Sequence, residues 1–130
     1  MTAFPLTIAT LLLALAIYIW AMLKVGRARG AYQVKAPAVT GPEAFERVFR
    51  AQQNTVEQML PFIPLLALAA AFWGDTWGAL YGLVWCAGRV LYIVTYAADA
   101  QKRAVGFLLT VLPTMLVILG LAATLVLRAF

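Results

Sequence analysis

Histidine and serine are both absent from the 130 residues of the chain, and cysteine occurs only once. Without histidine or serine, the chain cannot form a Ser-His-Asp triad or a site in which histidine binds a metal. The single cysteine, Cys86, lies in the apolar run GLVWCAG. It has no partner for an intrachain disulfide, and we expect it to be a buried, unreactive thiol.

Charged residues are also scarce. They make up 12% of the chain, whereas hydrophobic residues make up 65%. A soluble domain of this size cannot bury so much apolar surface, so the composition predicts a protein whose solvent is a lipid bilayer. Residues 1–23 carry no charge and lack the basic start of a signal peptide, so we expect them to form a retained first membrane helix.

Four apolar segments are each long enough to cross a bilayer, which takes ~20 helical residues. We expect helices at about residues 5–25, 41–73, 76–103 and 104–127. The apolar runs are continuous and do not alternate, which favours helices over a barrel. The short link GDTW predicts antiparallel neighbours. The sequence therefore predicts one all-α integral membrane domain over residues 1–130, an up-down bundle of four transmembrane helices.

The basic residues predict an orientation for this bundle. The first and third connections and the start of the second helix hold most of them, whereas the second connection has only Asp75. The basic residues concerned are Lys24, Arg27, Arg29, Lys35, Arg47, Arg50, Lys102 and Arg103. By the positive-inside rule, the first and third connections are cytoplasmic and both termini lie outside. We expect a multi-pass protein of a bacterial inner membrane.

Polar side chains recur with one helical spacing on the second and third helices, within a face about 80° wide on each. The two stripes are Arg47, Arg50, Asn54, Glu57 and Pro61, and Arg89, Tyr92, Tyr96, Asp99 and Arg103. A charge at the bilayer centre costs about 2.5–3.5 kcal/mol on insertion scales, so such residues face each other, a cavity or a ligand.

Two interpretations of the stripes remain open. In a purely structural one, Glu57 pairs with Arg89 or Arg50 and holds the bundle together. In the other, the excess of arginine over acid binds an anionic ligand in a partly dry cleft. Pro61 and Pro64 would bend the helix beyond Glu57, which either opens the cleft or only serves packing.

A ligand with two carboxylates and one ammonium matches this set of side chains, and glutathione is such a molecule. The arginines would bind its carboxylates and Glu57 its ammonium. Arg103, near the cytoplasmic mouth, would favour the thiolate, which is the nucleophile, and a tyrosine would donate a second hydrogen bond to the sulfur.

Three stretches, TGPEAFER, FERVFRAQQNTVEQMLP and GRVLYIVTYAADAQKR, resemble the MAPEG family, the membrane-associated proteins of eicosanoid and glutathione metabolism. The likeness covers nearly the whole chain, and the motif around residues 45–57 is specific. It implies homotrimers of four-helix protomers that bind glutathione between neighbours, with the site open to the cytosol.

The resemblance also implies the site residues by position. Arg103 matches the arginine that activates the thiolate, and with Tyr92 it is the candidate catalytic pair. Gln52 points away from the second-helix stripe, which a trimer explains if that helix lies between two sites. The glutathione-binding set is Arg29, Arg50, Gln52, Asn54, Glu57, Arg89, Tyr92, Tyr96 and Arg103, with glutathione as co-substrate and no metal.

The function expected first is that of a glutathione transferase or peroxidase. Its partners would be a homotrimer, membrane lipid and a hydrophobic small-molecule electrophile, with no nucleic acid. Gln58 and Gly30 stand where leukotriene-forming members carry tyrosine and arginine, which favours a general electrophile or a lipid hydroperoxide. The alternatives are a non-catalytic membrane scaffold that binds lipid or glutathione, and a small cation exporter, which would not surround its glutamate with arginines.

Overall fold

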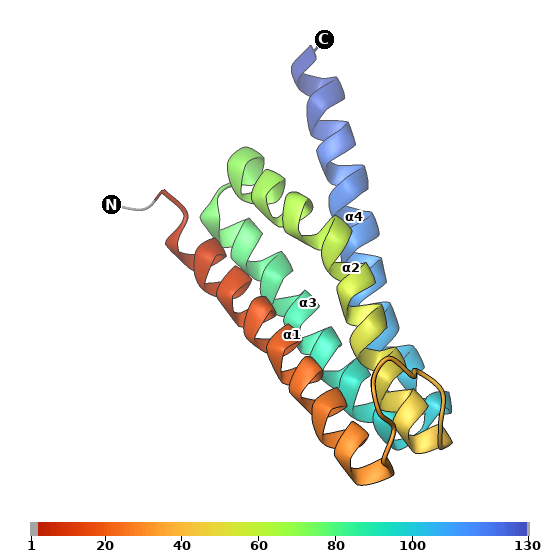
Figure 1. Cartoon of the computed structure of the whole chain (residues 1–130). Coiled ribbons are helices and arrows are strands. Elements are labelled where there is room, and N and C mark those ends of the chain that lie inside the picture. The colour runs from red at the N-terminus through yellow and green to blue at the C-terminus, as the bar shows by residue number, and fades with distance from the viewer. Residues whose placement is uncertain (1–2, 130) are drawn as a thin grey trace.

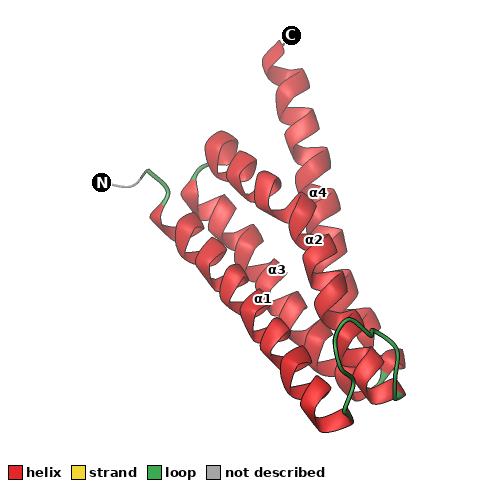
Figure 2. Ribbon diagram, in the orientation of Figure 1, coloured by secondary structure: helices red, strands yellow, loops and turns green. Residues whose placement is uncertain are grey.

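The computed structural model describes residues 3–129, and within that range it contains helices and no strand (Figures 1 and 2). The elements are α1 (Pro5–Tyr32), α2 (Glu43–Trp73), α3 (Asp75–Ala98), a short 3₁₀ helix η1 (Ala100–Arg103) and α4 (Ala104–Ala129). Four helical segments are long and apolar enough to cross a membrane, with η1 and α4 forming the last. The predicted all-α membrane bundle is confirmed.

Two helix boundaries differ from the expected ones. α1 continues beyond residue 25 and ends at Tyr32. Gln33 follows with a left-handed backbone (φ 55°), which turns the chain so that the Val34 N–H donates to the carbonyl of Arg29 (3.1 Å). The end of an apolar run marks the edge of the bilayer, and a helix need not end there. The third helix stops at Ala98, because Asp99 is extended and its carboxylate accepts a hydrogen bond from the Gln101 N–H, which caps η1.

α3 forms the centre of the bundle and packs against each of the other three long helices. In its apolar span 56% of the residues are buried within the chain, against 33% or less in the other spans. Around its middle, the ring of Trp85 stacks on Phe62 of α2 with centroids 4.0 Å apart. The side chains that position the site therefore project from a helix that is fixed on three sides.

Glycine lets the neighbours approach α3 closely. A Cβ at Gly78 would lie 2.5 Å from the hydroxyl oxygen of Thr7, and one at Gly82 would lie 2.5 Å from that of Thr10, both on α1. Small residues at helix crossings allow this approach in membranes, where packing rather than the hydrophobic effect holds helices together. Gly106 of α4 makes the corresponding close contact with α3.

At the upper end in Figure 1, where α1 begins and α4 ends, the turn between α2 and α3 also ties α1 in place. Gly74 makes this turn with φ 96°, a value that favours glycine. The Asp75 carboxylate then accepts hydrogen bonds from the N–H groups of Leu6 (2.9 Å) and Thr7 (2.7 Å) at the start of α1. One carboxylate thus satisfies two of the free N–H groups of that helix end.

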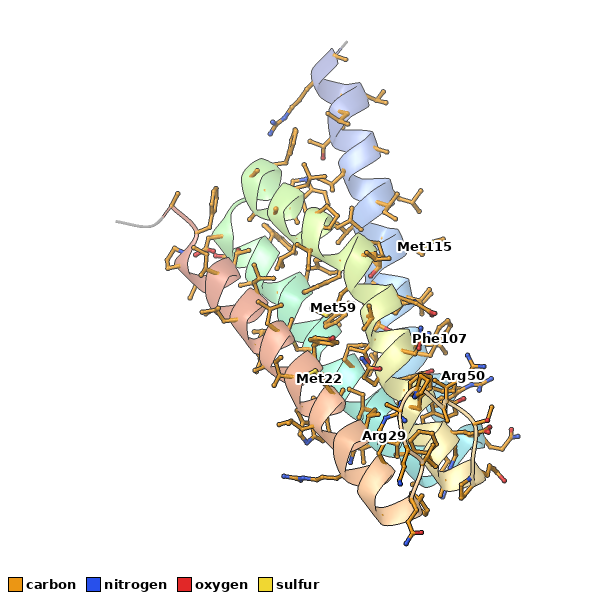
Figure 3. All side chains as sticks on the ribbon, viewed as in Figure 1. Met22, Arg29, Arg50, Met59, Phe107 and Met115 are labelled. Carbon is orange, nitrogen blue, oxygen red and sulfur yellow. The ribbon has the colours of Figure 1, made fainter. Side chains whose placement is uncertain are left out.

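At the opposite end lie η1 and the connection of residues 33–42. α2 bends on its way up from this end, and its interior holds Pro61 and Pro64, as expected for proline inside a helix (Figure 1). In Figure 3, carbon-only side chains project outward along the bundle, while nitrogen and oxygen atoms gather at this lower end. Arg29 and Arg50 of the predicted site both lie at this lower end, whereas the upper end holds Asp75 and Arg128.

Candidate functional site

A cleft of about 700 Å³ opens at the lower end of the bundle, between α2 on one side and α3, η1 and the start of α4 on the other. This volume lies within the ~300–1,000 Å³ that is usual for small-molecule sites. Six residues predicted for the site line it: Arg50, Asn54, Glu57, Tyr92, Tyr96 and Arg103. The two polar stripes of the sequence therefore face one another across one cavity.

The charges in this cleft do not neutralise one another. Within residues 3–129 the single salt bridge joins Arg47 to Glu43 (2.8 Å), outside the cleft. Glu57 pairs with neither Arg50 nor Arg89, so the ion pair that the purely structural interpretation expected is absent among residues 3–129. The cleft presents two exposed guanidinium groups and one exposed carboxylate that are free to meet a ligand.

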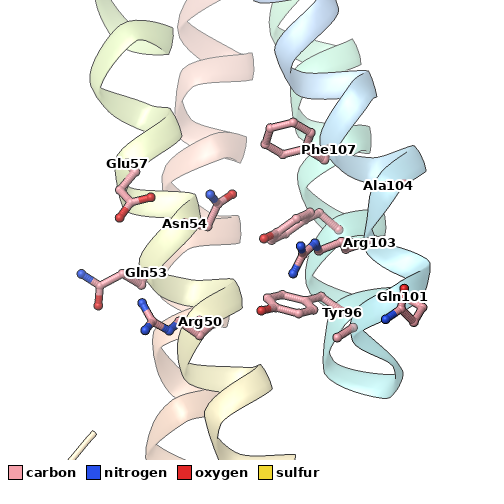
Figure 4. Close-up of a pocket in the computed structure, with 11 residues that line it drawn as sticks. Arg50, Gln53, Asn54, Glu57, Tyr96, Gln101, Arg103, Ala104 and Phe107 are labelled. Atoms are coloured by element: carbon pink, nitrogen blue, oxygen red, sulfur yellow. The ribbon is translucent and has the colours of Figure 1, made fainter.

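Two phenols and a guanidinium form the wall opposite α2. Arg103 lies over the ring of Tyr96, with its Cζ 5.2 Å from the ring centroid. The rings of Tyr92 and Tyr96 are 5.4 Å apart, with Tyr92 buried and Tyr96 half-buried. In Figure 4, Arg103 and Tyr96 lie across the gap from the polar side chains of α2. This wall offers a cation and hydroxyl groups to the same small volume.

Arg89 does not line the cleft, although it belongs to the predicted set. Its side chain is fully buried, and it donates from Nη1 to Asn54 Oδ1 (2.8 Å) and from Nη2 to Thr110 Oγ1 (2.8 Å). Its Cζ lies 4.3 Å from the centroid of the Tyr92 ring. Arg89 therefore contacts Asn54 and Tyr92, which line the cleft, but does not line the cleft itself.

Arg29 and Gln52 also lie outside the cleft of the single chain. Arg29 donates to the carbonyls of Val34 (3.3 Å) and Ala38 (2.7 Å), and its Cζ lies 5.3 Å from the ring centroid of Phe45. It therefore fastens the connection of residues 33–42 to the end of α1, and Figure 3 shows it at the same end of the bundle as Arg50. Gln52 is half-buried on another face of α2.

Two members of the stripes support helix ends instead of the cleft. Arg47 donates from Nε to the carbonyl of Ala97 (3.2 Å), near the last turn of α3. Asp99 caps η1 through Gln101. These contacts hold the lower ends of α2, α3 and η1 together, so they fix the distance between the two walls of the cleft.

The predicted set lacked five residues that line the cleft: Gln53, Ala100, Gln101, Ala104 and Phe107. Phe107 follows Arg103 by one helical turn, so the spacing alone could have placed both on one face. It supplies an apolar surface beside the polar groups. In the described part of the chain, no three His, Cys, Asp or Glu side chains are grouped so that they could hold a metal ion.

Comparison with known proteins gives the relationships of the chain. Over 108 residues it is 46% identical to an uncharacterized protein of Synechocystis sp., covering 83% of this chain and 79% of that protein. Human microsomal glutathione S-transferase 2 is 46% identical over 104 residues, which cover 77% of this chain and 71% of the human protein. Bovine leukotriene C4 synthase is 42% identical over 81 residues, or 62% of this chain and 54% of that protein. Residues 7–123 match the MAPEG family, and the chain belongs to this family of membrane proteins.

Proposed function

We propose that the chain is a membrane glutathione transferase that activates the glutathione thiol and transfers it to hydrophobic electrophiles. The observation that carries this proposal is the cleft in which Arg50, Arg103 and Glu57 form no salt bridge with any of residues 3–129 and lie beside two phenols. Relatives named glutathione S-transferase and leukotriene C4 synthase support the same chemistry. The apolar helices around the cleft support the bilayer as the source of the electrophile.

The donors and acceptors of the cleft fit glutathione group by group. Its two carboxylates match the guanidinium group of Arg50 and the amide donors of Asn54, because charge-assisted hydrogen bonds are the strong ones. Its ammonium matches the Glu57 carboxylate. Arg103 and Tyr92 are then the groups left for the sulfur, where a cation and a hydroxyl donor stabilise thiolate over thiol.

The reaction class follows from a stabilised thiolate. The sulfur attacks an electrophilic carbon, a C–S bond forms, and the leaving group departs with the electron pair of the broken bond. With a lipid hydroperoxide, two glutathione molecules supply two electrons, and the products are glutathione disulfide, an alcohol and water. Both reactions remove reactive lipophilic compounds, so the role is detoxification.

We further propose that the working form is a homotrimer. The resemblance implies that Arg29 and Gln52 bind glutathione, yet both are half-buried outside the cleft of their own chain, which supports a site completed by a neighbouring chain. The cleft would open on the cytoplasmic side of a bacterial inner membrane, in keeping with the basic residues at that end. Native mass spectrometry of the protein in mild detergent should show three copies.

An activity panel tests the proposed function. The purified protein in lipid nanodiscs is given glutathione together with 1-chloro-2,4-dinitrobenzene or a lipid hydroperoxide. We expect turnover of at least one of them, and loss of turnover in Arg103→Ala. A protein that binds glutathione but turns over neither compound would instead be a scaffold. A cation exporter is not favoured, since the chain belongs to the MAPEG family.

A further inference from the structure

Arg89 is an unusual residue in this bundle, because it is a fully buried cation with no carboxylate partner among residues 3–129. Two of its nitrogens donate to neutral oxygens, one on α2 and one on α4, and its Nε is buried with no hydrogen-bond partner in the same range. Burying an unpaired charge is costly, and an apolar residue of similar volume would hold the helices at least as well. Packing therefore does not account for an arginine here.

The contact between Arg89 and Asn54 fixes which way the Asn54 amide points. A guanidinium group can only donate hydrogen bonds, whereas an asparagine amide has one accepting oxygen and one donating nitrogen. The atom that faces Arg89 must therefore be Oδ1, at 2.8 Å. Because Asn54 lines the cleft, its NH₂ group is the part left to meet a ligand.

Thr110 fixes the other side of Arg89. Its Oγ1 accepts from Arg89 Nη2 and donates its own hydrogen to the carbonyl of Phe107 (2.8 Å) within α4. Arg89 is thus the hydrogen-bond donor in both contacts, to Asn54 on α2 and to Thr110 on α4. The Thr110 hydroxyl can also donate to the carbonyl of Gly106 (3.3 Å), and in both positions its oxygen still accepts from Arg89. A flipped Asn54 amide would instead bring its NH₂ group against the Arg89 donors, so α2, α3 and α4 together hold the amide orientation.

We infer that Arg89 is a positioning residue that acts on the ligand through Asn54, by holding the amide with its donor toward the cleft. This inference rests on the proposed function, and it replaces a direct contact between Arg89 and glutathione. Asn54 then recognises an acceptor on glutathione, a carboxylate or a carbonyl oxygen. An acceptor-only side chain at this position would repel that group.

A double-mutant cycle in glutathione binding tests the inference, measured by titration calorimetry on protein in nanodiscs. Arg89→Met and Asn54→Ala should each raise the dissociation constant by about tenfold or more, the effect of losing a hydrogen bond to a charged group. The double variant should bind glutathione as tightly as whichever single variant binds it more weakly. Additive losses, or an Arg89→Met variant that binds like wild type, would overturn the inference.

Two further variants separate positioning from a general structural effect. Arg89→Lys restores a cationic donor to Asn54 and should recover part of the affinity lost in Arg89→Met. Asn54→Asp keeps the acceptor for Arg89 but replaces the donor NH₂ by a second oxygen, so it should bind glutathione more weakly than Asn54→Ala. No recovery in the first, or binding by Asn54→Asp equal to or better than that of Asn54→Ala, contradicts the inference.

If Arg89→Met cannot be purified folded, Thr110→Val takes its place in the cycle. It removes one acceptor of Arg89 and does not touch the cleft. Thr110→Val should weaken glutathione binding about threefold in the wild-type background and not at all in the Asn54→Ala background. Equal losses in both backgrounds overturn the inference. Failure of wild type to bind glutathione would instead bring down the proposed function, and the inference with it.

Discussion

Gly106 of α4 lies directly against the backbone of Tyr92 in α3, with no room for a side chain between them. A Cβ at Gly106 would overlap the Tyr92 amide nitrogen and lie 2.6 Å from its Cα. Both are backbone atoms of the central helix, so they cannot rotate away. This contact sets how closely the start of α4, which holds Ala104 and Phe107 in the cleft wall, approaches the phenol of Tyr92.

Gly106→Ala should therefore push α4 away from α3. Overpacking of this kind costs about 1–3 kcal/mol of unfolding free energy. We also expect weaker glutathione binding, since one wall of the cleft shifts relative to the other. Thermal unfolding and calorimetry measure the two effects. The control is Gly26→Ala, where nothing lies within 4 Å of an added Cβ; indistinguishable behaviour of the two variants would contradict the role of the contact.

The apolar side of Phe107 leads to a second prediction. It lines the cleft beside Arg103, so it is placed to contact a hydrophobic electrophile. Phe107→Ala should raise the KM for a hydrophobic electrophile by about tenfold, which corresponds to about 1.4 kcal/mol of lost apolar burial on a half-exposed ring. The dissociation constant of glutathione should stay unchanged. Leu108→Ala, which removes an exposed side chain outside the cleft, is the matched control and should alter neither quantity.

The sequence was sufficient for the transmembrane helices, and six of the nine predicted site residues line one cleft. Hydropathy and helical periodicity depend only on local spacing, and they placed Arg50 and Glu57 on one face and Tyr92 and Tyr96 on another. The same periodicity predicts which face a residue occupies, but not how far along the helix the cleft extends. Arg47 therefore appeared in the stripe although it bonds to the carbonyl of Ala97.

Arg89 shows a second limit of the sequence. Its position on the stripe was correct, but its depth depends on how closely α2, α3 and α4 pack, which is decided by contacts far apart in the chain. The partners Asn54 and Thr110 lie 35 and 21 residues away. No local pattern distinguishes an arginine that lines a cleft from one that lies behind it.

Asp75 yields a prediction for the opposite end of the bundle. Asp75→Ala removes both acceptors for the N–H groups of Leu6 and Thr7. We expect the free energy of unfolding to fall by about 1–2 kcal/mol, as for other helix-capping residues. Hydrogen exchange at these two amides should become faster. Asp75→Asn keeps one side-chain oxygen, so its free energy of unfolding should lie between those of wild type and Asp75→Ala. The neighbouring exposed Thr76 provides the control, because Thr76→Ala should leave both amides protected.

Glu57 should recognise the amino group of glutathione. Acetylation of that amino group removes its charge, and we expect wild type to bind the acetylated peptide about tenfold more weakly, the usual effect of losing a charge-assisted hydrogen bond. Glu57→Gln should bind the two peptides equally. The control is Glu43→Gln, whose carboxylate lies outside the cleft and pairs with Arg47. Discrimination that persists in Glu57→Gln would assign the ammonium to another residue.

The central claim is that cations at the mouth of the cleft hold the bound sulfur deprotonated. Thiolate absorbs at about 240 nm, and its appearance on mixing protein with glutathione measures ionisation without any electrophile. Wild type at neutral pH should develop this absorbance, and so should Lys102→Ala, which removes a neighbouring cation outside the cleft. Arg103→Ala should bind glutathione without developing it. Equal absorbance in Arg103→Ala and wild type, or none in wild type that has bound glutathione, would contradict the account.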